Sequence, residues 1–476
     1  MARINTNVAA LSAQRGLAKA QQSLNSTLQR LSTGLKINSG ADDPAGLIAS
    51  EGLRSEMVGI QQGIDNSQQA ENVIATTEGS LNEVSSLLDN IQQLVVQSAN
   101  SGALSPDEIS ANQLQIDSAI ASITRISNTA SFAGLKLLDG SLDYVTSGVD
   151  TSQIDALHIH SANFGTQANI PVNVNVITSA RNAELQFQTS CIAQSVNLAV
   201  SGPEGVTNLT FVSGTTASAI GYAINQVSDS TGVKAKYINP ANINSGIIFY
   251  STDFGSKAYV SVEAKRGTFS TVNDANTAAT RATGVDAVAT INGDLTVADG
   301  LHLMVNNPSL DLELTLKNTV GTTATSFRVT GGGSKFQLGP QVNSAQQLSL
   351  GIQSVAATSL GDSDVGFLSD ISSGGPASLA NGSTTAASNI LARAINQVAV
   401  LRGRLGAFQK NTLDTNINSL QTALENVTQS ESNIRDADFA AETSNLTRAQ
   451  ILTQAGTSVL ATANSMPQTV LKLLTG

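Results

Sequence analysis

QAGTSVLATANSMPQTVLKLL, at residues 454–474, is the stretch that decides the fold. Its apolar residues recur every three or four positions, which predicts a long helix that packs against another helix. The flanking positions carry Gln, Asn, Ser, Thr and Ala instead of the Glu and Lys usual in coiled coils. Such a helix needs neighbours on several sides, so we expect it to become ordered on association with copies of itself. The stripe, which begins two residues earlier, consists of Leu452, Ala455, Val459, Ala463, Met466, Val470 and Leu474.

The N-terminal stretch QQSLNSTLQRLSTG, at residues 21–34, has the same character. Stripes of this kind occupy both ends of the chain and are absent between them, which predicts that the two ends pair and that the middle is inserted. An ordinary soluble helical bundle would show the same periodicity. The stripe residues of the N-terminal stretch are Leu24, Leu28, Leu31 and Leu35. Further stripes run through Leu81, Val84, Leu88, Ile91 and Val95, and through Leu401, Leu405, Phe408, Ile417, Leu420 and Leu424.

The middle of the chain has the composition of β structure. Pro44 is the only proline in residues 1–105 and none lies in 377–466, whereas proline and glycine punctuate the segment between. Runs such as IPVNVNVITS alternate β-branched residues between turn formers, and SAIGYAINQVSDSTGV predicts one short helix among them. We therefore expect a multi-domain α+β chain. Long coiled-coil helices come from both ends, with a central β-rich insertion of roughly two α+β modules.

Composition excludes several classes of function. The 476 residues hold 25 Lys+Arg against 36 Asp+Glu, a formal charge of −11, which argues against nucleic acid as a partner. No apolar run is long enough to span a membrane as a helix. The start MARINTNVAALSAQRG lacks the apolar core and cleavage site of a signal peptide, so we expect no cleaved signal.

Few residues qualify for chemistry. His158 and His160 share one strand face and could share a metal, but without a neighbouring carboxylate or an HExxH motif they are better explained as strand histidines. The third histidine is His302, and the single cysteine, Cys191, has no flanking base. Gly331–Gly333 lack the Lys of a phosphate loop and suit a β-turn or bulge. We expect no enzyme, no cofactor and no metal site.

Two polar motifs predict helix starts. Asp42 and Asp43 precede Pro44, where aspartate caps a helix whose first turn holds the proline. Ser105 stands before Pro106 in the same way. Capping accounts for the paired carboxylates without a bound cation.

The two chain ends resemble bacterial flagellin, the subunit of the flagellar filament. The matching motifs are long and occur in the order of the family. At the N-terminus they are INTN at 4–7, RLSTGLKINSGADDPAGLIAS at 30–50 and TTEGSLNEV at 76–84. At the C-terminus they are LRGRLGAFQ at 401–409, ESNIRDADFAAETSNLTRAQIL at 431–452 and the stretch at 454–474.

The resemblance implies three domains. Residues 1–41 and 436–476 would form an inner coiled coil lining the filament channel. Residues 42–175 and 345–435 would form an outer helical tube with a β-hairpin, and residues 176–344 would project as surface-exposed β-rich domains. Inner packing would involve Leu24, Leu28, Leu31 and Leu35 with Leu452, Val459, Met466 and Val470. Outer packing would involve Leu81, Val84, Leu88, Ile91, Leu94 and Val95 with Leu401, Leu405, Phe408, Ile417, Leu420 and Leu424.

The resemblance also implies a life cycle. Flagellins leave the cell unfolded through the flagellar type III export gate, with an export chaperone, and fold at the filament tip beneath a cap. Their partners are other copies of themselves, the cap and the hook–filament junction proteins, and their location is the extracellular filament used for swimming. A junction protein sharing the terminal helices, and a filament whose central domain serves adhesion, are the alternatives.

One segment departs from the family pattern. Flagellins recognised by the animal Toll-like receptor 5 carry arginines in the stretch that matches residues 88–100. Here Asn90 and Gln92 stand in their place, while Leu94 and Gln97 are kept. Because arginine anchors are common binding hot spots, we expect weak activation of that receptor.

Overall fold

The computed structural model describes residues 6–243 and 245–475, with side chains described as far as residue 469. The chain divides into two compact units, described separately below. The first contains residues 1–69, 337–342 and 411–476, and the second contains residues 70–336 and 343–410.

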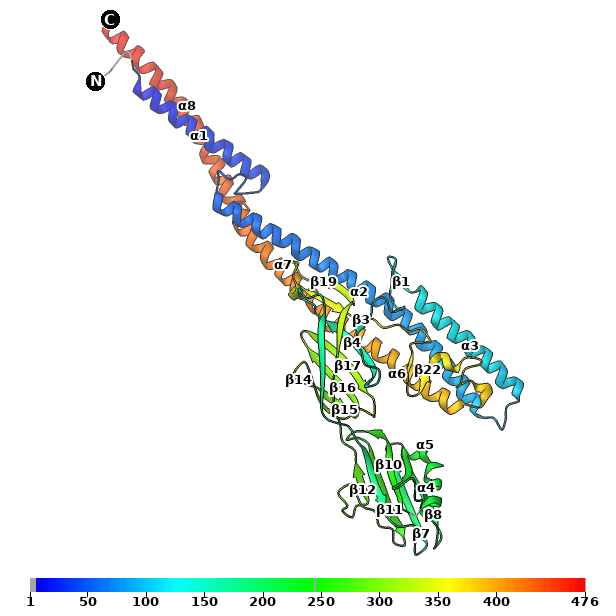
Figure 1. Cartoon of the computed structure of the whole chain (residues 1–476). Helices are drawn as coiled ribbons and strands as arrows, with labels where there is room; N and C mark the ends of the chain where they lie inside the picture. The colour runs from blue at the N-terminus through cyan, green and yellow to red at the C-terminus, as the bar shows by residue number, and fades with distance from the viewer. Residues whose placement is uncertain (1–5, 244, 476) are drawn as a thin grey trace. The chain divides into compact units, whose positions relative to one another are not determined.

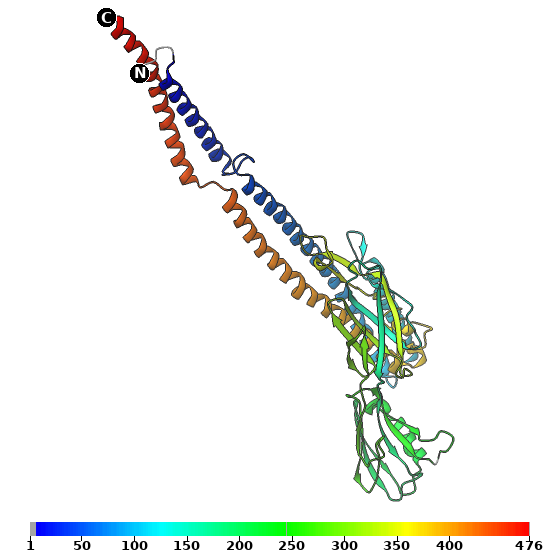
Figure 2. The ribbon, with the colours of Figure 1, turned by 60° about the vertical axis from the view of Figure 1, so that its left-hand side comes forward.

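Long helices from both chain ends build the first unit. Helix α1 (Val8–Thr33) starts at Asn7, whose side chain accepts a hydrogen bond from the Ala10 amide, and ends at Gly34 with φ +73°. Helix α8 (Phe439–Thr475) runs alongside α1 and continues through Pro467 (Figures 1 and 2). The expectation that the two ends of the chain pair as long helices is therefore confirmed.

Two further helices meet in this unit. They are α7 (Asp414–Arg435) and the first part of α2 (Pro44–Ala99). Helix α2 starts where predicted, because the Asp43 carboxylate accepts the Gly46 amide at 3.0 Å. Segment 337–342 crosses α2 closely: a Cβ on Gly59 would lie 2.9 Å from Pro340 Cβ. Asn416 of α7 donates to Leu338 O at 2.8 Å and fixes the same segment.

The helical part of the second unit consists of the rest of α2, α3 (Pro106–Thr129) and α6 (Thr384–Phe408). Ser105 caps α3 as predicted, and Glu108 completes a capping box. Asn112 of α3 donates to Ser98 of α2 at 3.0 Å in the buried interior. A hairpin with two residues in each strand, β1 (Ser131–Phe132) with β2 (Leu135–Lys136), follows α3. The shorter helical turns are η2 (Leu368–Ile371) and η3 (Leu379–Asn381). A π-helical turn, η4 (Gln409–Leu413), contains residues of both units.

A β-sandwich, here called the proximal sandwich, forms the first of two β cores in this unit. Its five-stranded sheet has the order β14-β13-β5-β18-β3, and its four-stranded sheet has the order β15-β16-β17-β4. Alternate residues of both sheets, such as Val174 and Leu312, face inward and are fully buried. The five-stranded sheet comprises β3 (Tyr144–Ser147), β5 (Ile170–Thr178), β13 (Val288–Ile291), β14 (Asp294–Leu295) and β18 (Ala324–Gly332). The four-stranded sheet comprises β4 (Ile154–Ala162), β15 (Val297–Asp299), β16 (His302–Asn307) and β17 (Leu310–Leu316).

A second β core, here called the inserted module, lies between β5 and β13 in the chain. Strands from two sheets enclose a core that α4 (Ala217–Asn225) completes with Ile220 and Ile224. Helices α4 and α5 (Ser228–Thr231) confirm the short helix predicted here. One sheet comprises β6 (Asn182–Phe187), β9 (Val233–Tyr237) and β10 (Ile247–Phe254). The other comprises β7 (Val196–Gly202), β8 (Gly205–Phe211), β11 (Tyr259–Arg266) and β12 (Arg281–Thr283).

The two β cores are nested, which the sequence did not predict. The sequence predicted roughly two α+β modules, and the structure places the second inside the first. Strand β5, before the insertion, hydrogen-bonds to β13 and β18, which follow it. A run of alternating residues identifies a strand but not its partner, so the nesting could not be deduced from periodicity.

The glycines at 331–333 form the bulge that was predicted. The register between β18 and β3 shifts between Val329 and Gly331. Gly332 has φ +90°, and a Cβ there would lie 2.2 Å from Asp143 O, so the backbone conformation and the space both require glycine. Two short strand pairs and one helical turn remain. The pairs are β19 (Ser334–Gln337) with β20 (Gln347–Leu350) and β21 (Gly361–Asp362) with β22 (Gly366–Phe367), and the turn is η1 (Ser344–Gln346).

Candidate assembly surfaces

The α1–α8 pair is held by small residues. On α8 the positions turned toward α1 recur every three or four residues and include Ala449, Gly456 and Ala463. At Gly456 an added Cβ would lie 3.5 Å from Leu17 Cα, so the two backbones approach closely. The corresponding positions of α1, all buried or half-buried, are Ala13, Leu17, Ala20, Leu24, Thr27 and Leu31.

Polar contacts fix the register of this pair. Asn7 donates its side-chain amide to Ala463 O at 2.7 Å, which joins the start of α1 to α8. Arg30 lies 3.9 Å from Glu442, whose side chain is only 10% exposed. The pair is therefore aligned near both ends of α1.

The larger apolar residues of α8 lie on a different face. Leu452, Val459 and Met466 are 52%, 57% and 59% exposed and are spaced seven residues apart. We call these three residues the α8 stripe. Leu28 of α1 is likewise 47% exposed, whereas Leu24, Leu31 and Leu35 are half-buried. Helix α8 includes Val470, whose side chain lies outside the described residues.

The seam within one chain thus differs from the predicted stripe. Helix α8 contributes Ala and Gly to this seam instead of its largest apolar residues, whereas α1 contributes Leu24 and Leu31 of the predicted stripe. Sequence reasoning also missed Val8, Leu11 and Ile451, which are 63%, 53% and 63% exposed. Three- and four-residue spacing from Leu452 does not reach Ile451, because adjacent residues of a helix lie about 100° apart. The packing of the α8 stripe therefore remains a prediction about contacts beyond one chain.

The predicted outer-tube residues divide by unit. In the second unit Leu81, Val84, Leu88, Ile91 and Val95 are at most 1% exposed, as is Leu405. Leu94, Leu401 and Phe408 are half-buried there. In the first unit Ile417, Leu420 and Leu424 of α7 are half-buried, and no residue of α7 is fully buried. The α2 residues therefore make a core within one chain, whereas α7 keeps apolar surface for further contacts.

The receptor-like segment lies on α2. Asn90 and Gln97 are exposed, and Gln92 and Leu94 are half-buried. Val96, which sequence reasoning did not select, is 60% exposed beside them. Asn90 and Gln92 thus present amides, next to the exposed Asp89, at positions where the resemblance predicts arginine.

The three histidines meet at one carboxylate. His160 Nε2 and His302 Nε2 each lie 3.5 Å from a different oxygen of Glu313. Arg404 of α6 lies 2.9 Å from Glu313 Oε2. Burial alone would raise the pKa of Glu313, but the neighbouring imidazoles and the Arg404 charge outweigh it, so the pKa lies well below its usual range. Burial lowers the pKa of His158, and Glu313 offsets this only in part.

The histidine cluster does not have the geometry of a metal site. Among residues 6–243 and 245–475 no group of three His, Cys, Asp or Glu side chains has the geometry to hold a metal ion. Cys191 is free and exposed. Within the same ranges no helix is long and apolar enough to cross a membrane.

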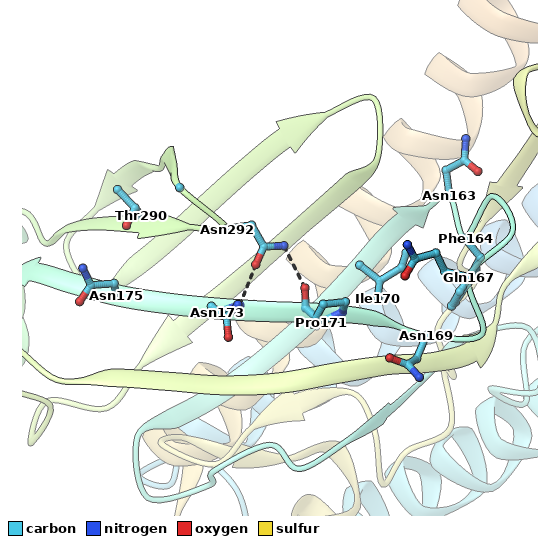
Figure 3. Close-up of a pocket in the computed structure, with 11 residues that line it drawn as sticks. Asn163, Phe164, Gln167, Asn169, Ile170, Pro171, Asn173, Asn175, Thr290 and Asn292 are labelled. Atoms are coloured by element: carbon cyan, nitrogen blue, oxygen red, sulfur yellow. Dashed lines mark hydrogen bonds between the residues drawn. The ribbon is translucent and has the colours of Figure 1, made fainter.

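An open groove of about 650 Å³ lies on the proximal sandwich (Figure 3). Its lining is uncharged and rich in amides, including Asn173 and Asn175. The Asn292 side chain donates to Pro171 O at 3.0 Å and accepts from the Asn173 amide at 2.8 Å. Asn292 also has φ +53° and begins an Asn-Gly turn. These bonds tie the hairpin turn to β5, which gives the central amide of the groove a structural role.

Comparisons with known proteins identify the family. The bacterial flagellin N-terminal helical region matches residues 4–143, and the bacterial flagellin C-terminal helical region matches residues 389–474. Flagellin of Salmonella rubislaw is 30% identical over 507 residues, with 99% of each chain covered. B-type flagellin of Pseudomonas aeruginosa is 31% identical over 500 residues at the same coverage. A solved structure of FliC from Burkholderia pseudomallei is 16% identical, with a TM-score of 0.24, and covers 72% of this chain and 99% of that one. The chain belongs to the bacterial flagellin family.

Proposed function

We propose that the chain polymerises through the α8 stripe, which the single subunit leaves exposed. The chain is a structural subunit of the bacterial flagellar filament, and its family is a structural one rather than a family of enzymes. The observation that carries the proposal is the 52–59% exposure of Leu452, Val459 and Met466. Large apolar side chains that recur at heptad spacing on a solvent face indicate a partner helix.

The partner helix is a second copy of the chain. Contact between the α8 stripe and a different face of the next subunit would be heterologous, and such contacts repeat without closing into a ring. Leu24, Leu28, Leu31 and Leu35 would take part in the same inner layer. The half-buried residues of α7 would pack in the outer layer.

The three-domain division is part of the proposal. Residues 1–41 with 436–476 would form the inner layer, residues 42–175 with 345–435 the outer layer, and residues 176–344 the projecting part. Its support is a paired break in the first unit, where Leu35 forms a β-bridge with Asp436 and the Ala437 amide donates to Gly34 O at 2.9 Å. The break between α1 and α2 therefore lies beside the break between α7 and α8.

Export and location follow from the family. The chain would leave the cell through the flagellar type III gate, assisted by an export chaperone, and fold beneath the cap. It would join the hook–filament junction proteins at the filament base and remain extracellular, with no cleaved signal. Mass spectrometry of subunits from isolated filaments tests the last point, because a shortened N-terminus beyond loss of Met1 would contradict it.

Electron microscopy of the purified chain tests the assembly proposal. We expect filaments from the full chain and none from a version lacking residues 437–476, since that version loses α8. Equal polymerisation of the two would overturn the proposed role of the terminal pair. Failure of the full chain to polymerise even when seeded would overturn self-assembly itself.

A further inference from the structure

All three histidines of this 476-residue chain gather on one sheet face. His158 and His160 lie on β4, His302 on β16, and Glu313 on β17 between them. Glu313 stands directly opposite His158 in the register. Their side chains occupy the outer face of the four-stranded sheet, because the alternate residues Leu312 and Leu314 fill the sandwich core.

The end of α6 contacts this face through Arg404. The guanidinium lies 2.9 Å from Glu313 Oε2, and His302 Nε2 lies 3.5 Å from the same oxygen. His160 Nε2 faces Oε1, is buried, and makes no hydrogen bond. The side chains of His160, Glu313 and Arg404 are 14%, 17% and 33% exposed, so solvent screens their charges only in part.

We propose that His158, His160, His302, Glu313 and Arg404 form a proton-operated latch. At neutral pH it would hold the end of α6 on the proximal sandwich, and it would release α6 when the buried His158 ring gains a proton in acidic solution. We call this group the histidine latch. The inference concerns contacts within one subunit and does not depend on how subunits assemble.

Charge balance supplies the mechanism. At neutral pH one carboxylate faces one guanidinium, so the two charges cancel. A proton on His158, the buried ring that stands opposite Glu313, adds a second cation beside this neutral pair. Glu313 already balances Arg404, so the added charge is disfavoured in this half-buried cluster. The cost is relieved when Arg404, which belongs to the separate helix, moves away.

Two other carboxyls face the latch. Asp143, in the loop before β3, interacts with His160, and burial raises the pKa of its carboxyl. Asp311 precedes Glu313 by two residues on β17 and therefore shares its sheet face. Acidification removes negative charge from Asp143 sooner than from an ordinary aspartate, so it adds to the excess of positive charge.

Proton linkage determines whether low or high pH favours opening of the latch. Burial lowers the pKa of His158 in the closed state, whereas opening hydrates the ring and restores its ordinary value of about 6.5. Below that pH the open state binds more protons, so opening is favoured as pH falls. Each proton taken up can change the opening constant by up to about tenfold per pH unit.

Hydrogen exchange of the full-length monomer between pH 7.5 and 5.0, corrected for intrinsic rates, tests the latch. We expect protection of α6 residues 398–408 to fall as pH drops below about 6.5. The triple variant His158→Gln, His160→Gln, His302→Gln should lose this pH dependence. The inserted module provides an internal control, since it contains no histidine and its exchange should not follow the same curve.

A second measurement does not depend on any variant folding. The histidine ring signals of the wild-type chain in proton–carbon NMR spectra should include one, from His158, that titrates below its ordinary range. An ordinary titration of the His158 ring, with α6 protection that is flat in the wild-type chain, would overturn the latch. Equal pH dependence in the wild-type chain and the triple variant would also overturn it. Glu313→Gln should expose α6 already at pH 7.5.

Discussion

Replacing the α8 stripe by serine tests whether assembly energy lies on that face. The variant carries Leu452→Ser, Val459→Ser and Met466→Ser, and its monomer should keep its α1–α8 pair because these side chains do not contribute to that seam. Each is more than half exposed in the single chain. Burying the remaining half of such a side chain on assembly contributes about 1 kcal/mol, so three contribute about 3 kcal/mol per subunit. At 1.4 kcal/mol per factor of ten, the critical concentration for polymerisation should rise roughly a hundredfold.

Sedimentation of seeded filaments at graded subunit concentrations measures the critical concentration. A matched control replaces Gln450, Thr457 and Asn464, which are exposed on α8 with the same seven-residue spacing, by serine. We expect the control to polymerise as the wild-type chain does, and circular dichroism to show equal helix content in all three proteins. If the stripe variant assembled at the wild-type concentration, the assignment of assembly energy to this face would be refuted.

Three further predictions concern single helices. Leu88→Ala, at a fully buried position, should lower the free energy of unfolding by about 3 kcal/mol, whereas Val96→Ala on the exposed side of α2 should change it by less than about 0.5 kcal/mol in denaturant titrations. Gly59→Leu should destabilise the first unit by about 1–3 kcal/mol because of the contact with Pro340. Gly79→Ala should instead stabilise α2 by about 0.5–1 kcal/mol in thermal melts, because an added Cβ there meets nothing within 4 Å. The chain should activate Toll-like receptor 5 weakly in reporter cells, and Asn90→Arg with Gln92→Arg should increase the response; full potency of the unmodified chain would contradict this.

The sequence was sufficient where structure depends on local periodicity and capping. Helix α2 begins at Asp43 and Pro44, and α3 begins at Ser105, as the cap residues predict. The buried stripe from Leu81 to Val95 follows directly from three- and four-residue spacing. These features depend on residues within a few positions of one another, so one sequence contains all the information they need.

The identity of the α1–α8 seam required knowledge of the partner. Alanine, glycine and threonine carry little hydrophobic signal, yet they let helix backbones approach closely, as Gly456 does with Leu17. Because α8 contributes mainly small residues to the seam, its side of the seam buries little apolar area and stabilises the terminal pair weakly in a lone subunit. Because small residues of α8 face α1, the α8 stripe stays exposed on another face of the helix. A sequence that favours assembly over an independently stable monomer therefore has its most visible apolar stripe on the outer face.

The histidine latch shows a different limit of sequence reasoning. His158 and His160 are separated from Glu313 by about 150 residues, and the inserted module lies in that interval. Their meeting depends on the pairing of β4 with β17 and on the irregularities in that register between Asp311 and Leu312 and between Thr315 and Leu316. A shift of one residue would turn Glu313 into the sandwich core and place Leu312 beside the histidines. Burial of the Leu310–Leu316 alternation forbids that shift, so the hydrophobic pattern of β17 also fixes the position of its carboxylate.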